Sequence, residues 1–221
     1  MNIPADLIPN AVSASAAALF IALLCWNLAG AAWGLLRKNL LEWVFVAGCG
    51  LMGLLWLMRV EAQAGLELHF LGLMSLVLVF GWRLAFVGAS VVLLMMTALG
   101  LYDWATLGVN GLVGVALPVL VAHAAQVSIY RALPKHYFIY LIVTAHFGAM
   151  LVMVAVCCTV AALMIALGVY RVDRVVNDYL VFLPMVMLSE GFINGAIMTL
   201  LTLLKPEWVR SFDDRDYIEG Q

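Results

Sequence analysis

The chain has 221 residues, of which 66% are apolar and only 11% are charged, and its formal net charge is −2. Soluble domains carry about 25% charged residues, so this chain has too few polar side chains to cover a water-facing surface. Its mean hydropathy is +1.09, and apolar stretches of about 20 residues recur along it, as in membrane-spanning helices. We therefore expect a membrane protein whose surroundings are the lipid bilayer, with no nucleic-acid partner.

Seven segments are predicted to span the membrane. In chain order they are Ala11–Leu36, Leu40–Met58, Leu66–Phe80, Leu84–Leu101, Ala105–Val127, Tyr137–Val169 and Tyr179–Leu204. The third is short for a full crossing and could be tilted, capped by a loop or partly re-entrant, whereas the sixth is long enough to require tilting. We expect an all-α bundle of about seven transmembrane helices, with a single membrane domain over residues 1–204 and a short acidic cytoplasmic tail over residues 205–221.

The basic residues favour a topology with the N-terminus outside and the C-terminus inside. If all seven segments cross, the cytoplasmic side receives eight basic residues: Arg37, Lys38, Arg83, Arg131, Lys135, Lys205, Arg210 and Arg215. The outer side receives three: Arg59, Arg171 and Arg174. This asymmetry follows the positive-inside rule. No basic residue precedes Arg37, so the basic start of a cleavable signal peptide is missing and we expect Met1 to be the mature N-terminus.

Several chemistries find no support in the sequence. The four cysteines, Cys25, Cys49, Cys157 and Cys158, lie in apolar stretches without metal-site spacing and are predicted to be packing residues. The sequence contains no phosphate-binding Gly-Lys-Ser/Thr loop, so ATP-driven transport would need another subunit as its motor. The sequence has no nucleophile and general base at a spacing typical of an enzyme, and we expect a non-enzymatic protein.

Polar residues are costly inside a membrane, so each one is a functional candidate. His69, at the start of the third segment, is either a solvated interfacial histidine or a metal ligand, because neutral imidazole suits nickel, cobalt, copper and zinc. Asp103 could favour a helix N-terminus through the helix dipole. Asn110 lies deeper, where its amide needs a partner. Glu190 and Asn194 are four residues apart on one helix face and could form an ion or proton relay or a buried polar clamp.

Small residues predict two close helix contacts. Glycines at 108, 111 and 114 permit close approach of a neighbouring helix, and packing is their expected role. Ala14, Ala18 and Ala22 form a stripe at intervals of four on the first helix. This stripe either packs internally or binds a partner subunit, and the sequence does not separate the two.

Four motifs, taken in chain order, resemble one family. Met1-Asn2-Ile3-Pro4 resembles a Met-His-Ile-Pro start, and Leu68-His69-Phe70-Leu71-Gly72 resembles Gly-His-Leu-Leu-Gly. Asp103 to Asn110 is similar to Asp-Gly-Gly-Leu-Thr-Ala-Leu-Gly-Ala-Asn with two residues missing, and Glu190 to Gly195 is similar to Glu-Gly-Leu-Ile-Thr-Gly. These motifs belong to the cobalt/nickel energy-coupling-factor permeases, the CbiM-like substrate-binding components. The resemblance covers nearly the whole chain.

The resemblance implies a permease for a transition-metal ion such as cobalt, nickel or copper, in a bacterial inner membrane and without an organic cofactor. It implies a transmembrane coupling subunit and cytoplasmic ATPase subunits as partners. In that family the N-terminal segment folds into the helical body from outside, and its amine, the second residue and a later histidine bind the metal. On this sequence those metal ligands are Met1, Asn2 and His69.

The sequence departs from the family pattern at position two, where Asn2 replaces the histidine whose imidazole belongs to the chelate. An amide oxygen is a poorer donor for nickel, cobalt or copper. This predicts weaker metal binding, a different metal, or a substrate that is not a metal ion. The alternative function is a membrane interaction or assembly protein that keeps the scaffold without transporting.

Overall fold

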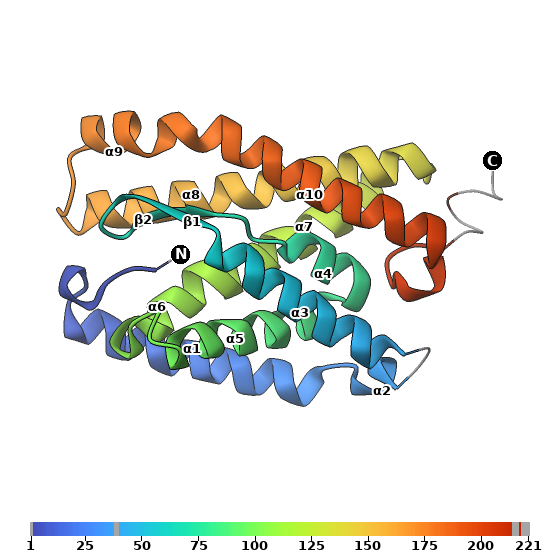
Figure 1. Ribbon diagram of the computed structural model, residues 1–221, viewed down its shortest axis with the longest axis horizontal. Helices are drawn as coiled ribbons and strands as arrows, with labels where there is room; N and C mark the ends of the chain where they lie inside the picture. The colour runs from blue at the N-terminus through green and yellow to red at the C-terminus, as the bar shows by residue number, and fades with distance from the viewer. Residues whose placement is uncertain (1, 38–39, 214–216, 218–221) are drawn as a thin grey trace.

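The structure is a computed structural model that describes residues 2–37, 40–213 and 217 of the chain. Its helices run mostly lengthwise in Figure 1. Met1 and Lys38 lie outside the described residues, as do residues 214–216, which include Arg215, and residues 218–221 of the predicted acidic tail.

Ten α-helices and one β-hairpin make up the described part of the chain. The helices are α1 (Asn10–Gly30), α2 (Trp33–Leu36), α3 (Leu41–Leu57), α4 (Leu73–Phe80), α5 (Trp82–Ala98), α6 (Leu107–Gly111), α7 (Leu117–Ala132), α8 (Gly148–Ala166), α9 (Val172–Asp178) and α10 (Leu183–Leu204). The hairpin is formed by β1 (Arg59–Gln63) and β2 (Leu66–His69). π-helical turns over Leu112–Ala116 and Ile139–Phe147 join α6 to α7 and lead into α8.

Within the described residues, four continuous helical stretches are long and apolar enough to cross a membrane. They are Asn10–Gly30, Trp104–Ala132, Ile139–Ala166 and Val172–Leu204. The apolar helices α3 and α5 have 17 residues each, at the lower end of the range of about 17–25 residues that a crossing needs. The structure is mostly helical, as the sequence predicts, but the β-hairpin departs from the all-α prediction, and seven crossings remain a prediction.

The third predicted segment, Leu66–Phe80, is not one spanning helix. Its first four residues form β2, and only α4 is helical. Eight helical residues rise about 12 Å, far less than a hydrocarbon core about 30 Å thick. Every residue of α4 is buried, so the other elements enclose this helix and keep it from lipid. A single helix over the whole segment is therefore ruled out, and a shorter helix preceded by non-helical chain, which is the loop-capped alternative, describes it.

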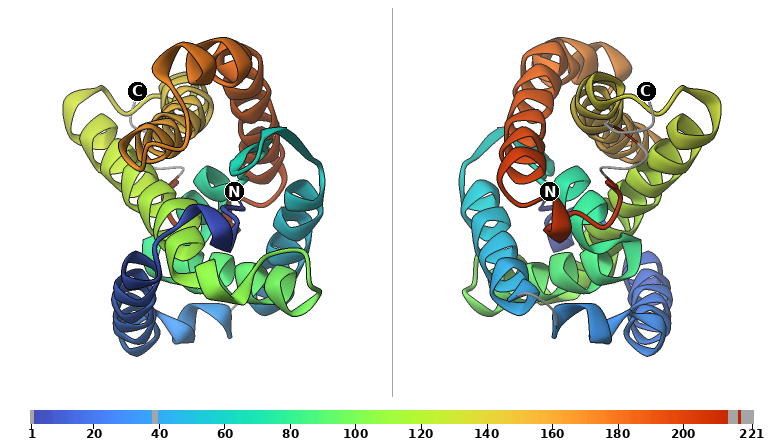
Figure 2. Two further views of the ribbon diagram at one scale, coloured as in Figure 1. Left: turned by 90° about the vertical axis from the view of Figure 1, so that its left-hand side faces the viewer. Right: turned by 90° about the vertical axis from the view of Figure 1, so that its right-hand side faces the viewer.

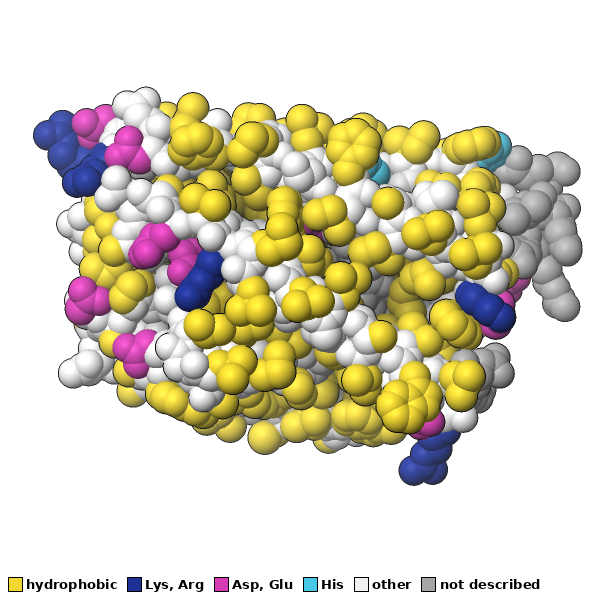
Figure 3. All heavy atoms as spheres, in the orientation of Figure 1, with side chains coloured by type: hydrophobic (Ala, Val, Ile, Leu, Met, Phe, Trp, Pro, Cys, Tyr) yellow, Lys and Arg dark blue, Asp and Glu magenta, His cyan; other side chains and the backbone are white. Residues whose placement is uncertain are grey.

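Apolar side chains cover the flank of the bundle, whereas charged side chains gather toward its two ends (Figure 3). Exposed large apolar residues come from nearly every long helix, for example Ile21, Val46, Leu120, Leu151 and Phe192. Exposing so much apolar surface to water would be unfavourable, and a contiguous band of it marks a surface that contacts lipid.

Basic residues from the two groups that the topology argument separates lie at opposite ends of α5. Arg174 on α9 donates from Nη2 to Oε1 of Gln63 on β1 over 3.1 Å, so α9 lies beside the hairpin that begins at Arg59. Arg83 lies in the first turn of α5. The last residues of that helix, Thr97 and Ala98, line a cavity at its other end.

Helices α1 and α6 pack with almost no space between their backbones. A Cβ atom on Gly108 would overlap the backbone of Ala17, and one on Gly111 would come within 2.6 Å of the ring of Phe20. The predicted packing role is confirmed for these two glycines. Around a Cβ at Gly114 nothing lies within 4 Å, so close packing does not explain that glycine.

The small-residue stripe of α1 faces away from the bundle. Ala14, Ala18 and Ala22 are all exposed, whereas Ala16 and Phe20, on the side toward α6, are buried. Internal packing within this chain is therefore not the role of the stripe. The stripe therefore contacts either lipid or another protein.

Gly108 in α6 and Gly114 in the π-helical turn after it provide a matched test of this packing. Gly108→Ala is expected to lower the free energy of unfolding by about 1–3 kcal/mol, because the methyl group forces α1 and α6 apart. Gly114→Ala is expected to leave it unchanged or to raise it by up to about 1 kcal/mol, because alanine favours helix and meets open space. Chemical unfolding in mixed micelles measures both, and equal effects of the two changes would contradict the packing described here.

Candidate functional site

The segment that precedes α1 is folded into the bundle. The backbone N–H of Asn2 donates to Oε2 of Glu67 over 3.1 Å, and that of Ile3 donates to Oδ1 of Asn110 over 2.9 Å. The side chain of Ile3 is completely buried. Viewed along its long axis, the molecule has this segment in the middle of the helices (Figure 2). The expected insertion of the N-terminal segment is confirmed for Asn2 and Ile3, while Met1 lies outside the described residues.

The hairpin beside this segment presents its second strand to the interior. Arg59 pairs with His69 and Glu61 with Glu67 across the two antiparallel strands, and all four residues of β2 are buried. Gly65 makes the turn with a φ of +77°, a conformation that favours glycine. Because side chains alternate along a strand, Glu67 and His69 lie on the same face of β2.

The carboxylate of Glu67 connects three parts of the chain. One oxygen accepts the N–H of Asn2, and the other lies 3.4 Å from Nη1 of Arg59. The guanidinium of Arg59 in turn lies 5.4 Å from the centre of the Tyr102 ring. Burial raises the pKa of Glu67 above its ordinary value, and the positive charge of Arg59 acts in the opposite direction. The carboxylate is thus a buried acceptor at the inserted segment.

The imidazole of His69 is held in one tautomer. Its Nδ1 lies 2.9 Å from the carbonyl oxygen of Phe70, and because a carbonyl can only accept, Nδ1 carries the proton. Burial lowers the pKa of His69 well below its ordinary value, so the ring is neutral and has a lone pair on Nε2. The ring centre lies 5.5 Å from that of Trp56. A neutral histidine whose second nitrogen donates to a carbonyl is the usual arrangement of a metal-binding histidine.

One further polar atom at the inserted segment lacks a partner. Oδ1 of Asn2 is buried and accepts no hydrogen bond from the described residues. Buried polar atoms normally have a partner, so this oxygen is available to a ligand. Across the described ranges, no group of three or more histidine, cysteine, aspartate or glutamate side chains could hold a metal ion. A metal site at Glu67 and His69 would therefore need further donors of another kind, such as atoms of the N-terminal segment.

A cavity of about 660 Å³ leads to His69 from the side of α9 and α10. At its rim, Nε2 of Gln63 donates to Oδ2 of Asp178 over 3.3 Å, and Arg174 lies 3.5 Å from the same carboxylate. A second cavity, of about 520 Å³, is lined by Asn2 and Asp103. The candidate site therefore lies between two openings at one end of the bundle.

The remaining predicted site residues have structural partners. Oδ1 of Asp103 accepts the N–H of Ala105 over 3.0 Å, so this carboxylate caps the short helical turn at Trp104–Thr106. Asn110, by contrast, holds Ile3 and donates to Oγ1 of Thr106 over 3.3 Å. The structure thus brings Asn110 to the inserted segment and gives Asp103 the capping role.

Glu190 and Asn194 on α10 form a polar clamp on the start of α4. The carboxylate of Glu190 accepts the N–H groups of Leu71 and Gly72, each over 2.8 Å. Oδ1 of Asn194 accepts the N–H of Ser75 over 3.0 Å and its hydroxyl over 2.8 Å. The sequence left a proton or ion relay and a buried polar clamp open for this pair, and these contacts are those of a clamp. The clamp begins two residues after His69 and so fixes the strand that carries it.

One known family matches the chain over nearly its whole length. The family model described as "CbiM: Cobalt uptake substrate-specific transmembrane region" matches residues 2–208 of the chain. The chain belongs to the CbiM family. It is a membrane-embedded transporter component, and the family resemblance predicted from the four motifs is confirmed.

Solved structures show the same fold as this CbiM-family chain. One, described as a transition metal transporter, superposes with a TM-score of 0.75 at 16% sequence identity over 92% of this chain and 93% of that one. Another, described as a truncated transition metal transporter, has a TM-score of 0.71 at 15% identity over 92% of this chain and 99% of that one. A search of curated proteins found no match.

Sequence reasoning missed Glu67, the residue that ties the site of this CbiM-family chain together. The signal was present in Leu66-Glu67-Leu68-His69, where apolar and polar residues alternate as in a strand with one polar face. Because the segment was assigned to a helix, Glu67 and His69 were not placed on one face. No pattern in the sequence predicts the contact between Asn110 and Ile3.

Removing the clamp tests its structural role. Glu190→Ala leaves two buried N–H groups without acceptors and is expected to cost about 1–3 kcal/mol of stability for each. Glu190→Gln keeps one acceptor oxygen and should cost less. The free energy of unfolding in mixed micelles is the measurement, and Glu207→Ala, at an exposed position, is a control expected to change it by less than about 0.5 kcal/mol. A Glu190→Ala protein as stable as this control would disprove the clamp.

Proposed function

We propose that this CbiM-family chain is the substrate-binding membrane subunit of an energy-coupling-factor-type uptake transporter, with a transition-metal ion such as cobalt or nickel as its substrate. The observation that carries the proposal is the insertion of Asn2 and Ile3 beside the strand of Glu67 and His69. A chain segment held there by buried hydrogen bonds brings donor atoms to a neutral imidazole, which is how a small cation can be enclosed.

The proposed ligands are Met1, Asn2 and His69, and we add Glu67. The imidazole of His69 supplies nitrogen, whereas Oδ1 of Asn2 and the carboxylate of Glu67 supply oxygen. Carboxylate and carbonyl oxygens suit harder divalent ions such as manganese, while imidazole suits zinc, copper, iron and nickel. We therefore propose that Glu67 compensates for the imidazole missing at position two and shifts the preference away from a nitrogen-only site for nickel or copper.

Arg59 opposes cation binding at this site, because its guanidinium already neutralises one oxygen of Glu67. A divalent ion would displace Arg59 from the carboxylate. The carbonyl of Leu101 and the ring of Tyr102, which both already contact the guanidinium, can keep it in place after that exchange. The proposed metal substrate therefore competes with the guanidinium of Arg59 for the carboxylate of Glu67.

The proposed orientation in a bacterial inner membrane has the inserted segment outside and the C-terminus inside. Arg59, Arg171 and Arg174 then lie on the outer side, and Arg83 and Arg210 face the cytoplasm, as the positive-inside rule requires. The substrate would enter from outside through the cavities at Asn2 and His69. The hairpin would lie on the outer side, and the chain from Leu71 through α4 would lead inward as the third of seven crossings.

A metal titration of detergent-purified protein with an untagged N-terminus tests the substrate proposal. At least one of cobalt, nickel, copper, zinc and manganese is expected to bind in a one-to-one ratio. His69→Ala and Glu67→Gln are each expected to weaken that binding about tenfold or more, equal to about 1.4 kcal/mol, because the first removes the nitrogen donor and the second replaces a charged carboxylate by a neutral amide. Asn2→His is expected to strengthen nickel binding by restoring the nitrogen donor.

His136→Ala is the matched control, because this histidine lies outside the bundle core before the turn at Ile139. It is expected to bind metal as the unmodified protein does. The absence of binding for all five metals, or equal binding by the His69→Ala and His136→Ala proteins, would refute the proposed site.

The partner proposal concerns the exposed alanine stripe of α1, which fits a coupling subunit. Ala18→Phe is expected to reduce co-purification of the coupling and ATPase subunits from native membranes, because a large ring prevents close helix contact. Ala124→Phe, at an exposed position on α7, is the control expected to retain them. A stable complex without any ATPase would favour the alternative, an assembly or interaction protein.

A further inference from the structure

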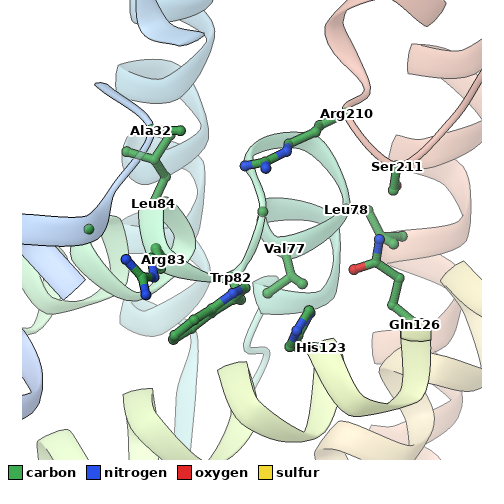
Figure 4. A pocket seen from close by; sticks show the side chains of 12 residues that line it. Ala32, Val77, Leu78, Trp82, Arg83, Leu84, His123, Gln126, Arg210 and Ser211 are labelled. Atoms are coloured by element: carbon green, nitrogen blue, oxygen red, sulfur yellow. The ribbon is translucent and has the colours of Figure 1, made fainter. Parts of the chain in front are cut away.

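A cavity of about 370 Å³ lies at the end of α5 that is remote from the inserted segment. It is bounded by the end of α1, the junction of α4 with α5, one face of α7 and the segment after α10 (Figure 4). Its polar lining consists of Arg83, His123, Gln126, Arg210 and Ser211. No acidic residue is among the lining residues, so the lining carries two positive charges.

The guanidinium of Arg83 is held in position by aromatic rings and by a glycine. Its central carbon lies 5.0 Å from the ring centres of both Trp26 and Trp82, at cation–π distance. A Cβ atom on Gly30 would overlap this guanidinium, so the last residue of α1 leaves room for it. Contacts with α1, at Trp26 and Gly30, and with Trp82 on α5 itself therefore hold Arg83 at the cavity.

Arg210 is fixed on the opposite side of the same junction. Its backbone N–H donates to the carbonyl of Val79 over 3.1 Å, and its Nη1 donates to that of Phe80 over 3.4 Å. The guanidinium lies over Gly81, where a Cβ would come within 2.8 Å of it and where φ is +82°. Two guanidiniums, each over a glycine, thus face one cavity.

Neither arginine forms an ion pair with a carboxylate within the described ranges, although Asp213 lies with Arg210 on the lining of a neighbouring cavity. The ion pairs of the described residues involve Arg59, Arg171, Arg174 and Lys205. The N-terminus of α5 adds further positive potential, because its first turn has no acidic residue and no side-chain cap. Two oriented guanidiniums beside such a helix end match the oxygens of a phosphate group.

The surroundings of the cavity point to a lipid as the source of that phosphate. Trp26 is 53% exposed and Trp33 is 43% exposed, and both lie on the chain that borders the cavity at Gly30 and Ala32. Exposed tryptophans concentrate at the depth of the lipid headgroups. A basic cavity between helices at that depth fits an anionic headgroup better than a metabolite in bulk water.

We propose that the cavity between Arg83 and Arg210 binds the phosphate of an anionic phospholipid from the leaflet at this end of the bundle. The site is separate from the proposed metal site and does not depend on the transported substrate. Arg210 and Ser211 lie beyond residues 2–208, which the family model matches. A bound headgroup would join α1, α5 and the C-terminal segment across their shared junction.

Native mass spectrometry of the detergent-purified full chain tests the proposal, with phosphatidylglycerol and phosphatidylcholine as probes. Phosphatidylglycerol is expected to bind more tightly than phosphatidylcholine. Arg83→Gln and Arg210→Gln are each expected to weaken its binding about fivefold, and the double change about 25-fold, because each arginine near the surface contributes about 1 kcal/mol. Arg37→Gln, an exposed position outside the cavity, is expected to leave binding unchanged.

Gln126→Glu provides a second variant that keeps both arginines and their packing. It places a negative charge in the cavity and is expected to weaken phosphatidylglycerol binding while leaving the melting temperature in detergent unchanged. Equal binding of the two lipids, or equal binding by the Arg37→Gln and the double-arginine proteins, would overturn the proposal. Tight binding of inorganic phosphate that displaces the lipid would assign the cavity to a free anion and also overturn it.

Discussion

A short helix enclosed by apolar side chains needs partners for the backbone groups at both of its ends, because neither lipid nor an apolar core supplies any. In α4 this requirement is met at the start by Glu190 and Asn194, which accept three N–H groups. At its end, backbone N–H groups of Arg210 and Ser211 donate to carbonyls of the helix. The position of His69, two residues before the first clamped N–H, follows from this constraint.

The same requirement determines how the N-terminal segment enters the bundle. A chain that inserts between helices brings N–H groups that must be satisfied, and here a carboxylate and an amide oxygen from two different elements accept them. Glu67 is both an anchor for Asn2 and a candidate ligand, so attachment of the segment and binding of a cation use the same carboxylate. Asn110 is an anchor only, which leaves the segment attached at Ile3 whatever Glu67 binds.

Much of this architecture could be predicted from the sequence, because helices in lipid are encoded by long apolar stretches and by shared helix faces. The pairing of Glu190 with Asn194 follows from their spacing of four. The hairpin could not be predicted as readily, since four residues of alternating pattern in Leu66–His69 are outweighed by the apolar run that follows. The exposure of Ala14, Ala18 and Ala22 could not be predicted either. A stripe of small residues at intervals of four is compatible both with packing against a neighbouring helix and with facing outward.

The partners of α4 are synthesised well after α4 itself. Leu71 and Glu190 are 119 residues apart, and the C-terminal segment that closes the other end follows α10. During translation this helix therefore has no acceptors for its first N–H groups until α10 has left the ribosome and entered the membrane. The centre of the molecule is therefore completed only after α10 and the segment that follows it have been made, and a chain truncated before α10 would leave it open.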